Sequence, residues 1–367
     1  MEAHKNSDEK SGITTGSVAT AASVAAILTL TDKAPEVIEI TAPNDELTVE
    51  IEDNKLLSED KAISTVRKPT YNDPDVTRGI LIKSEVTLTD DTGNVEITAG
   101  EGVGKITKSG LQIPVGEYAI NPVPRKMIKT NVKKYLPENK GAIVKIIIPE
   151  GKEIAPKTMN SRLGIIDGIS ILGTTGIARP MSSKAYTDSL KIQIDVAIAN
   201  KYEDLLFVPG NIGTRIANER LVIDDDAIIE MSNFVGYMLD EADKTGKIKS
   251  ITLFGHAGKL IKIAAGIFNT KQSVADARRE IMTAYTALIG ADKKTLQAVY
   301  DCITTEDVIK ILDKKGITTE VFELIADKII ELCNSKYNIE FHAIIAKMDG
   351  TILTPSKMKD IPFEWKN

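Results

Sequence analysis

The 367-residue chain is poor in the side chains that hold metals or form disulfides, with two cysteines and three histidines. Cys302 and Cys333 lie in helical patterns and form no C-x-x-C pair, so we expect neither a disulfide framework nor a zinc site. The histidines are scattered along the chain, which also argues against a protein-bound metal. This cysteine usage fits a reducing, cytoplasmic setting.

Long apolar runs are also missing. No run approaches the roughly 20 residues that span a bilayer, and the N-terminal segment MEAHKNSDEKSG is polar. A strong charge of one sign is absent too, since 46 basic and 52 acidic residues give a net charge of -6. This balance argues against a general nucleic-acid surface. We expect a small-molecule ligand and neither a membrane nor a nucleic-acid partner, and we leave a homo-oligomer open.

Common hydrolase and nucleotide motifs are missing as well. The sequence has no G-x-S-x-G elbow and no Walker A motif. The segment Gly100–Gly104 follows a strand pattern and superficially matches a glycine-rich nucleotide loop. Such a loop opens a helix, whereas Gly110 and Pro114 stand where that helix would run. We reject a dinucleotide-binding fold here and leave two interpretations open, a plain turn or a ligand-facing β-loop.

The chain is long enough for two domains. Its pattern of predicted strands and helices also changes along the sequence. Strand patterns alternate between residues 37 and 98, an amphipathic basic helix follows at 125–134, and another strand at 142–148. These elements predict an α+β N-terminal domain at 1–160, with an antiparallel sheet and helices. Residues 149–160 are expected to connect it to the second domain.

A helix pattern rich in small side chains begins this first domain at residues 18–30. Small residues allow a helix to approach a sheet closely. Thr14-Thr15-Gly16-Ser17 precedes the helix and predicts its N-terminal cap. A contact between this helix N-terminus and an anionic ligand is the alternative.

The second domain, 161–367, is expected to be an α/β domain with a small, mainly parallel sheet. Its boundary lies between residues 150 and 195. Strands are predicted at 169–172, 205–208, 250–254 and 340–347, and helices at 182–199, 228–243 and between 273 and 337. This alternation of strands with helices is typical of a parallel sheet with right-handed crossovers.

Glycine-containing loops follow three of these strands, at Gly173–Gly176, Gly210–Gly213 and Gly255–Lys259. In parallel α/β sheets, ligands bind beyond the carboxyl ends of the strands. We therefore predict that the three loops meet at one edge of the sheet and line a pocket. His256 in the third loop is a candidate for a ligand contact or a proton transfer. A purely structural role for this histidine stays open.

Basic side chains are found in or beside the same segments, and a cluster of them around a pocket would suit a polycarboxylate ligand. They are Arg125, Lys126, Arg162, Arg179, Lys259, Arg278 and Arg279.

Several segments together resemble one protein family. They are SGITTGSVATAAS, DPDVTRG, GEGVGKITKSGLQIPVGEYAINPVPR, LGIIDGISILGTTGIARPMS, SNFVGYML and GHAGKLIKIAAGIFNTKQSVADAR. In colinear order from about residue 11 to about 290, they resemble the signature segments of the cobalt-precorrin-5B carbon-1 methyltransferases of anaerobic cobalamin biosynthesis, the CbiD family.

The resemblance implies an S-adenosylmethionine-dependent methyltransferase that converts cobalt-precorrin-5B to cobalt-precorrin-6A and releases S-adenosylhomocysteine. It implies a corrinoid substrate that brings its own cobalt. It also implies an α+β domain similar to a domain of a small-subunit ribosomal protein, followed by a small parallel α/β domain. Because a sulfonium is already an activated methyl donor, this chemistry needs positioning more than a strong base.

On this resemblance we divide the candidate site residues into three sets. The methyl donor is expected at Gly173, Thr174, Thr175, Gly176, Gly210, Asn211, Gly213 and Gly255. The corrinoid is expected at Arg125, Arg179, Lys259, Glu101 and Gly102. His256 is the candidate catalytic residue.

The sequence departs from the family pattern at Val18, Arg78, Asp167 and Lys271, where cysteine, histidine, glycine and histidine are usual. These departures leave open a corrinoid-binding protein of the same pathway without transfer activity. A sugar- or nucleotide-dependent enzyme, which would bind a phosphate ligand, is the other alternative.

Overall fold

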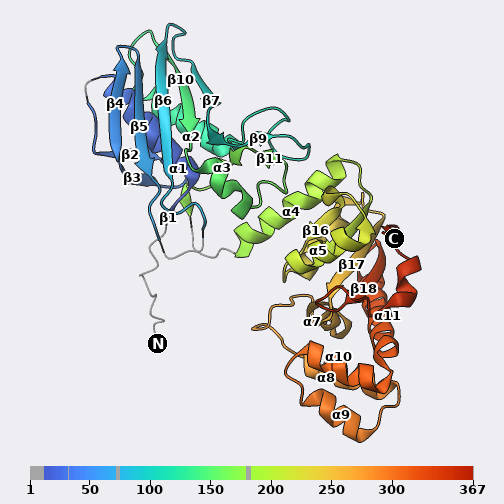
Figure 1. Cartoon of the computed structure of the whole chain (residues 1–367). Helices are drawn as coiled ribbons and strands as arrows, with labels where there is room; N and C mark the ends of the chain where they lie inside the picture. Colours follow the sequence, from blue (N-terminus) through green and yellow to red (C-terminus); the bar gives the residue numbers. More distant parts are fainter. Residues whose placement is uncertain (1–11, 32, 72–74, 179–182, 367) are drawn as a thin grey trace. The chain divides into compact units, whose positions relative to one another are not determined.

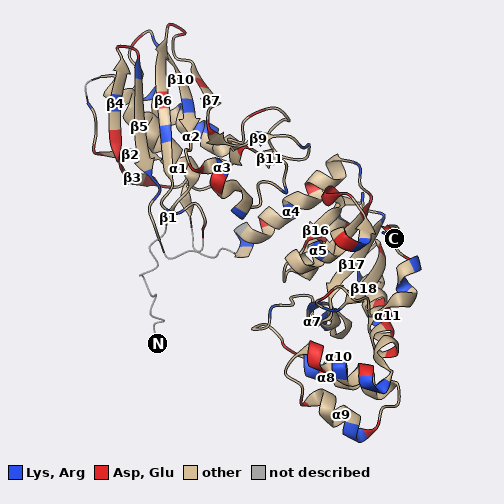
Figure 2. Ribbon diagram, in the orientation of Figure 1, with Lys and Arg blue, Asp and Glu red and all other residues tan. Residues whose placement is uncertain are grey.

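A computed structural model describes residues 12–31, 33–71, 75–178 and 183–366 of the chain. The chain divides into two compact units, Met1–Ser183 (unit 1) and Lys184–Asn367 (unit 2) (Figure 1). Residues 161–183 therefore belong to unit 1, and the division lies inside the expected range of 150–195. Basic and acidic residues are interspersed along both units (Figure 2). The described residues include no helix long and apolar enough to cross a bilayer.

Helix α1 (Thr15–Thr29) is the centre of unit 1. Every residue of this helix except Leu28 is buried, because its alanines, serines and glycine leave little side-chain volume on any face. The Thr14 Oγ1 atom caps the helix by accepting a hydrogen bond from the Ser17 amide at 3.2 Å. The expected buried, capped helix is confirmed.

A five-stranded sheet lies against α1. The Ser23 hydroxyl of α1 is 2.9 Å from the Ser84 hydroxyl of the sheet, a direct bond that only small side chains permit at a helix–sheet contact. The sheet order is β4-β5-β6-β10-β7, with β4 Asp53–Ser58, β5 Lys61–Arg67, β6 Leu81–Thr89, β10 Gly141–Ile147 and β7 Val95–Ala99. All neighbours are antiparallel except β10 and β7, which are parallel, so the sheet is mixed rather than purely antiparallel as expected.

Helix α2 (Pro122–Lys133) and the hairpin of β2 (Val37–Thr41) and β3 (Glu46–Glu50) complete this core. The Asn131 side chain joins them, because its Oδ1 atom accepts from the Thr41 amide at 2.8 Å and its Nδ2 atom donates to the Thr41 carbonyl at 2.9 Å. A buried amide that satisfies both backbone groups fixes the hairpin against α2.

Residues 149–178 do not lead into unit 2, contrary to the sequence-based expectation. They form α3 (Gly151–Ile154), a 3-10 turn at Ala155–Lys157 and three short strands, β11 (Ile165–Ile166), β12 (Gly168–Ile169) and β13 (Ile177–Ala178). These strands pair with β9 (Lys105–Ile106), β8 (Gly102–Val103) and β1 (Gly12–Ile13), all in unit 1.

Unit 2 contains the predicted parallel sheet. Its order is β16-β14-β17-β18, with β16 Ile228–Glu230, β14 Asp204–Val208, β17 Ser250–His256 and β18 Glu340–Ala346, and every neighbouring pair is parallel. A two-residue pair, β15 (Leu221–Val222) with β19 (Glu364–Trp365), lies beside it. The helices of this unit are α4 Ser183–Ala199, α5 Asn211–Arg220, α6 Val235–Thr245, α7 Ala257–Leu260, α8 Arg278–Leu288, α9 Lys293–Tyr300, α10 Thr305–Lys315 and α11 Thr318–Lys336.

The short strand β16 was not expected, because residues 228–243 show a helical pattern throughout. Only the part from Val235 onward is helical, as α6. The first three residues instead pair with Leu206–Val208 of β14. This correction matters because β14 now has its successor β16 on one side and β17 on the other, which reverses the direction in which the chain adds strands.

Two glycines with positive φ provide a stability test of unit 1. A Cβ at Gly102 (φ +73°) would lie 1.7 Å from the Ile148 carbonyl oxygen, whereas a Cβ at Gly116 (φ +92°) has no atom within 4 Å. Gly116→Ala is expected to cost about 1–2 kcal/mol through backbone strain alone. Gly102→Ala must in addition displace backbone, so we expect a loss of roughly 3 kcal/mol or more. Thermal unfolding of both variants checks this, and equal midpoints would contradict the packing at Gly102.

Candidate ligand site

Signature segments from distant parts of the sequence meet at the N-terminus of α1. The Gly16 amide donates to the Leu172 carbonyl at 3.0 Å, and the Thr14 amide donates to the Gly176 carbonyl at 3.0 Å. The Ser17 hydroxyl also donates to the Gly176 carbonyl, at 2.6 Å. These backbone donors are used within unit 1, which favours the structural interpretation of this helix N-terminus over an anion contact.

The loop Gly173–Gly176 packs on the same segment. Cβ atoms at Gly173 and Gly176 would lie 2.4 Å from the Thr14 Oγ1 atom and 2.6 Å from the Ala42 Cβ atom, and both glycines have positive φ. Thr174 is exposed, and the Thr175 hydroxyl bonds to the backbone of Ile177. This close packing explains why both positions are glycine, and no bound ligand is needed to explain it.

The prediction that three loops end strands of one parallel sheet is wrong for this first loop. The strand before it pairs with β8, and Ile171 forms a bridge with Ile120, both in unit 1. The other two loops do follow neighbouring strands of the unit 2 sheet. The unit 2 sheet therefore brings the loops Gly210–Gly213 and Gly255–Lys259 together.

The Gly100–Gly104 segment contains the short strand β8 and is followed by β9, so it does not open the helix that a dinucleotide loop requires. Glu101 is exposed, and its carbonyl accepts from the Ile148 amide at 2.9 Å. Gly102 is buried against backbone. A role of Glu101 and Gly102 in corrinoid binding stays a prediction.

The Arg125 guanidinium makes its hydrogen bonds to groups within unit 1. Its Nε atom donates to the Ile120 carbonyl at 2.7 Å, and its Nη2 atom lies 3.3 Å from the Tyr118 carbonyl and 3.2 Å from the Glu117 carboxylate. The guanidinium therefore holds the segment before α2, and few of its donors are left for a ligand. Arg179 lies outside the described residues.

The described part of the DPDVTRG segment, from Asp75 onward, is held by a buried lysine that the sequence did not single out. The side chain of Lys68 is 1% exposed, and its ammonium lies 2.6 Å from the Asp75 carboxylate. Asp75 also accepts from the amide and the hydroxyl of Thr77, at 2.8 and 2.7 Å. Burial opposes ionisation, but these bonds outweigh it and lower the pKa of Asp75.

The structure explains two of the four departures from the family pattern, Val18 and Asp167. Val18 is fully buried in α1, where a small apolar side chain fills the place of a cysteine. Asp167 has φ +61°, a left-handed conformation that suits glycine and that aspartate tolerates. Arg78 and Lys271 are exposed. None of these positions lies in the unit 2 site described next.

The carboxyl ends of β14 and β17 form the candidate site of unit 2. The connections from these neighbouring strands leave in opposite directions, to β16 on one side and to β18 on the other, which is the arrangement at which α/β sheets bind ligands. Gly210, with φ +138°, lies between the end of β14 and α5, and the exposed Asn211 begins α5. His256 ends the second strand and precedes α7.

Glycines let these two loops pack directly on each other. A Cβ at Gly255 would lie 2.6 Å from the Pro209 ring, and one at Gly213 would lie 2.9 Å from the Val208 Cβ atom and 3.3 Å from the Phe254 carbonyl. The Lys259 ammonium donates to the Pro209 carbonyl at 3.0 Å and joins the loops. Lys259, assigned to the corrinoid from the sequence, therefore belongs with the predicted donor-binding glycines.

His256 is neutral at pH 7. Burial, followed by the nearby cations Lys259 and Arg278, lowers the pKa of His256 to about 4. Its ring forms no hydrogen bond with any residue in the described part of the chain. A neutral imidazole offers one N–H donor and one acceptor nitrogen. It suits hydrogen bonding to a ligand better than proton transfer near pH 7.

A second buried lysine, also missed from the sequence, fixes the segment beside this site. Lys262 is 2% exposed, and its ammonium donates to the carbonyls of Thr270 and Ala275 at 3.2 and 2.7 Å. The Thr270 amide donates in turn to the Asn233 carbonyl at 2.9 Å, in the loop after β16. The Lys262 contacts therefore join the loops that follow β16 and β17.

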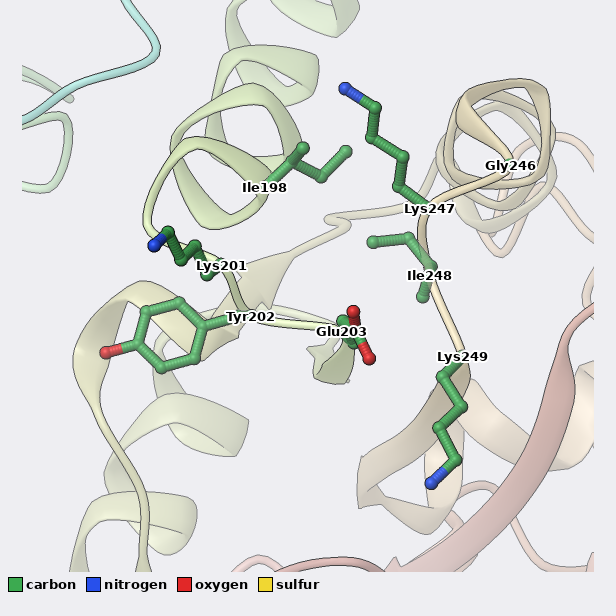
Figure 3. Close-up of a pocket in the computed structure, with 8 residues that line it drawn as sticks. All are labelled: Ile198, Lys201, Tyr202, Glu203, Gly246, Lys247, Ile248 and Lys249. Carbon is green, nitrogen blue, oxygen red and sulfur yellow. The ribbon is translucent and has the colours of Figure 1, made fainter.

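Two cavities of unit 2 lie at the opposite, amino-terminal edge of the sheet, not at the predicted edge. The larger, of about 590 Å³, lies between Lys201–Glu203 before β14 and Gly246–Lys249 before β17 (Figure 3). Neither segment carries a predicted site residue. Within the described ranges, no group of three His, Cys, Asp or Glu side chains is placed to hold a metal ion. The absence of a protein-bound metal stays a prediction.

Comparisons with known proteins place the chain among relatives of one kind. Residues 2–180 match the family model described as CbiD, and residues 269–357 match the model described as CbiD, C-terminal domain. The chain is 76% identical over 367 residues to the cobalt-precorrin-5B C(1)-methyltransferase of Methanosphaera stadtmanae, covering 100% of this chain and 97% of the relative. It is 51% identical over 346 residues to the protein of the same name in Methanobrevibacter smithii, covering 93% and 96%.

A solved structure is also similar to the chain. It is the 1.9 Å crystal structure of the cobalamin biosynthesis protein cbiD from Archaeoglobus fulgidus, at 29% identity and a TM-score of 0.39. The match covers 73% of this chain and 84% of that one.

Acidification is expected to destabilise unit 2 through His256. Its pKa is about 4 in the folded chain against an ordinary value of 6.5, so the unfolded chain takes up the proton first. The contribution of neutral His256 is fully present above pH 6.5 and is lost as the pH falls to about 4. At most about 3 kcal/mol is involved. Urea unfolding between pH 4.5 and 7.5 measures the dependence.

His256→Gln should remove this part of the pH dependence, and the control variant His342→Gln should keep it. An identical slope in the wild type and His256→Gln would contradict the burial of a neutral ring at this position.

Proposed function

The chain belongs to the CbiD family, and from that premise we propose that it is a cobalt-precorrin-5B C(1)-methyltransferase, acting with S-adenosylmethionine as the donor. The support is the 76% identity over the whole chain to a relative of that name. The corrinoid substrate would bring its cobalt with it. The likeness of unit 1 to a ribosomal-protein domain is part of the same proposal.

We propose that unit 2 binds the methyl donor at the carboxyl ends of β14 and β17. The observation that carries this assignment is the reversal of strand order there, with a glycine loop on each strand. Gly210, whose Cβ position has only the Glu230 Oε1 atom nearby, lets a ligand approach the backbone closely, whereas Gly255 is required by the packing on Pro209. The donor supplies a methyl group already activated on sulfonium, so the residues of the chain have only to orient it and exclude water.

The charged side chains of this edge suit a zwitterionic ligand. The Lys259 ammonium gives one of its three donors to Pro209, which leaves two for a ligand. The Glu230 Oε1 atom lies 3.3 Å from the Cβ position at Gly210, so a carboxylate borders the same loop. The loop at Gly173–Gly176 is left out of the donor site because its glycines already pack against Thr14 and Ala42.

For the corrinoid, unit 1 remains the proposed binding region. Arg125 supports the segment before α2 through its bonds to Ile120 and Tyr118. The adjacent Lys126 is exposed, and its ammonium is the better candidate for a substrate carboxylate.

A methyl-transfer assay tests the activity directly. The full-length chain is incubated with cobalt-precorrin-5B and S-adenosylmethionine labelled with 13C in the methyl group. We expect a corrinoid that gains one labelled methyl group at carbon 1, seen by 13C NMR, and one S-adenosylhomocysteine for each methyl transferred. Tight corrinoid binding without incorporation of the label would instead support the non-catalytic alternative.

Hydrogen exchange tests where the donor binds. With saturating S-adenosylhomocysteine, amides in the segments 209–213 and 255–262 should exchange more slowly because the ligand covers or orders them. Amides at 173–176 should change little. Protection confined to 173–176 would place the donor in unit 1 and contradict the assignment to unit 2.

A further inference from the structure

One glycine of α7 leaves a space between two polar side chains. The atoms closest to the Cβ position at Gly258 are the His256 Cε1 and Nδ1 atoms, each at 3.4 Å, and the Thr305 Oγ1 atom, at 3.6 Å. These are ordinary van der Waals distances. The space that a methyl group at this position would fill therefore borders both the imidazole and the hydroxyl.

The Thr305 hydroxyl lies in this space without a partner. Thr305, the first residue of α10, is 7% exposed, and its Oγ1 atom is buried without a hydrogen bond in the structure. The hydroxyl is not needed to cap the helix, because the Thr304 Oγ1 atom accepts from the Asp307 amide at 3.1 Å. An unpaired buried hydroxyl costs about 1–3 kcal/mol, so this atom points to a partner from outside the chain.

The groups around this space favour an anion. The His256 ring has an N–H donor and no partner among the described residues, and the Lys259 ammonium has two donors left. Arg278 contributes a further cation, although Asp276 accepts two bonds from it. The donors belong to α10, the end of β17 and α7, and α7 contacts both of the other elements.

We propose that His256, Lys259 and Thr305 form a subsite for the carboxylate at the amino-acid end of the methyl donor. The proposal rests on the proposed function and deepens it. A carboxylate has two oxygens that accept several hydrogen bonds, which matches three donors of different kinds. Because Gly258 has no side chain, a carboxylate oxygen can approach the imidazole and the hydroxyl from this side of α7. Thr305 is then a ligand-binding residue that belongs to none of the signature segments.

Calorimetry with two ligands isolates the contribution of the amino-acid end. S-adenosylhomocysteine carries the amino-acid end, whereas 5′-methylthioadenosine lacks both its carboxylate and its amino group. In the full-length chain, Thr305→Val and Gly258→Ala should each weaken S-adenosylhomocysteine binding at least tenfold. The same variants should change 5′-methylthioadenosine binding less than twofold.

Both variants are designed to fold. A Cβ at Gly258 meets its neighbours at ordinary contact distance, and Thr305→Val removes only an unpaired hydroxyl. Their thermal midpoints should match or exceed the wild-type value. Thr286→Val, which removes another buried unpaired hydroxyl, in α8, is the matched control and should leave the binding of both ligands unchanged.

The outcomes separate this proposal from the proposed function. If S-adenosylhomocysteine binds the wild type and both variants equally, the carboxylate subsite is wrong while donor binding stands. If the variants weaken both ligands alike, the site binds the donor but not through its carboxylate, and the subsite is again wrong. If the wild type binds no S-adenosylhomocysteine, the proposed function fails as well.

NMR of the histidine ring gives a second measurement that a merely structural role would not alter. The chain has three histidines, so His256→Gln assigns the signal. The cations facing the ring are Lys259 and Arg278. A bound carboxylate would offset them, so S-adenosylhomocysteine should raise the pKa of His256 and 5′-methylthioadenosine should not. Equal titration curves with both ligands would overturn the subsite.

Discussion

Parallel pairing of β14 with β17 is the constraint on which the candidate site of unit 2 depends. It fixes the distance between two loops that are about 45 residues apart in sequence and directs both to the same edge of the sheet. Glycine at positions 213 and 255 lets the loops meet without side chains between them. The Lys259–Pro209 bond then joins them. A small displacement of either strand would separate the polar groups that this edge brings together.

Periodicity in the sequence predicted much of the fold, and it failed where local pattern and tertiary pairing disagree. The strands of unit 2 at 204–208, 250–256 and 340–346 were found because each is a continuous buried run between turn signals. The three residues of β16 were assigned to a helix because a run so short carries no period of its own. The apolar run before Gly173 was assigned to the wrong sheet, since hydrophobicity shows burial but not the partner strand.

The site residues show the same limit of prediction from the sequence alone. Glycine-rich loops predicted a ligand site at the carboxyl edge of the unit 2 sheet, because ligand sites in such sheets follow from strand direction. The structure brings two of these loops together at that edge, and ligand binding there stays a prediction. Thr305 and Lys262 gave no signal in the sequence. A threonine at a helix start resembles an ordinary cap, and a lysine in an apolar stretch resembles a surface charge. Their significance comes from burial and from missing or unusual hydrogen-bond partners, which only the folded chain reveals.

The pairing of β1 with β13 has a consequence for synthesis on the ribosome. Gly12 lies opposite Ala178, so unit 1 is closed by strands from its two ends. The central helix α1 leaves the exit tunnel before the elements that pack on it, and one of these, helix α2, begins only at Pro122. Until α2 is made, the nascent chain must keep an apolar helix that β2, β4, β5 and β6 cover only in part. Contacts of such long range form slowly, which makes the half-made domain a natural client for chaperones.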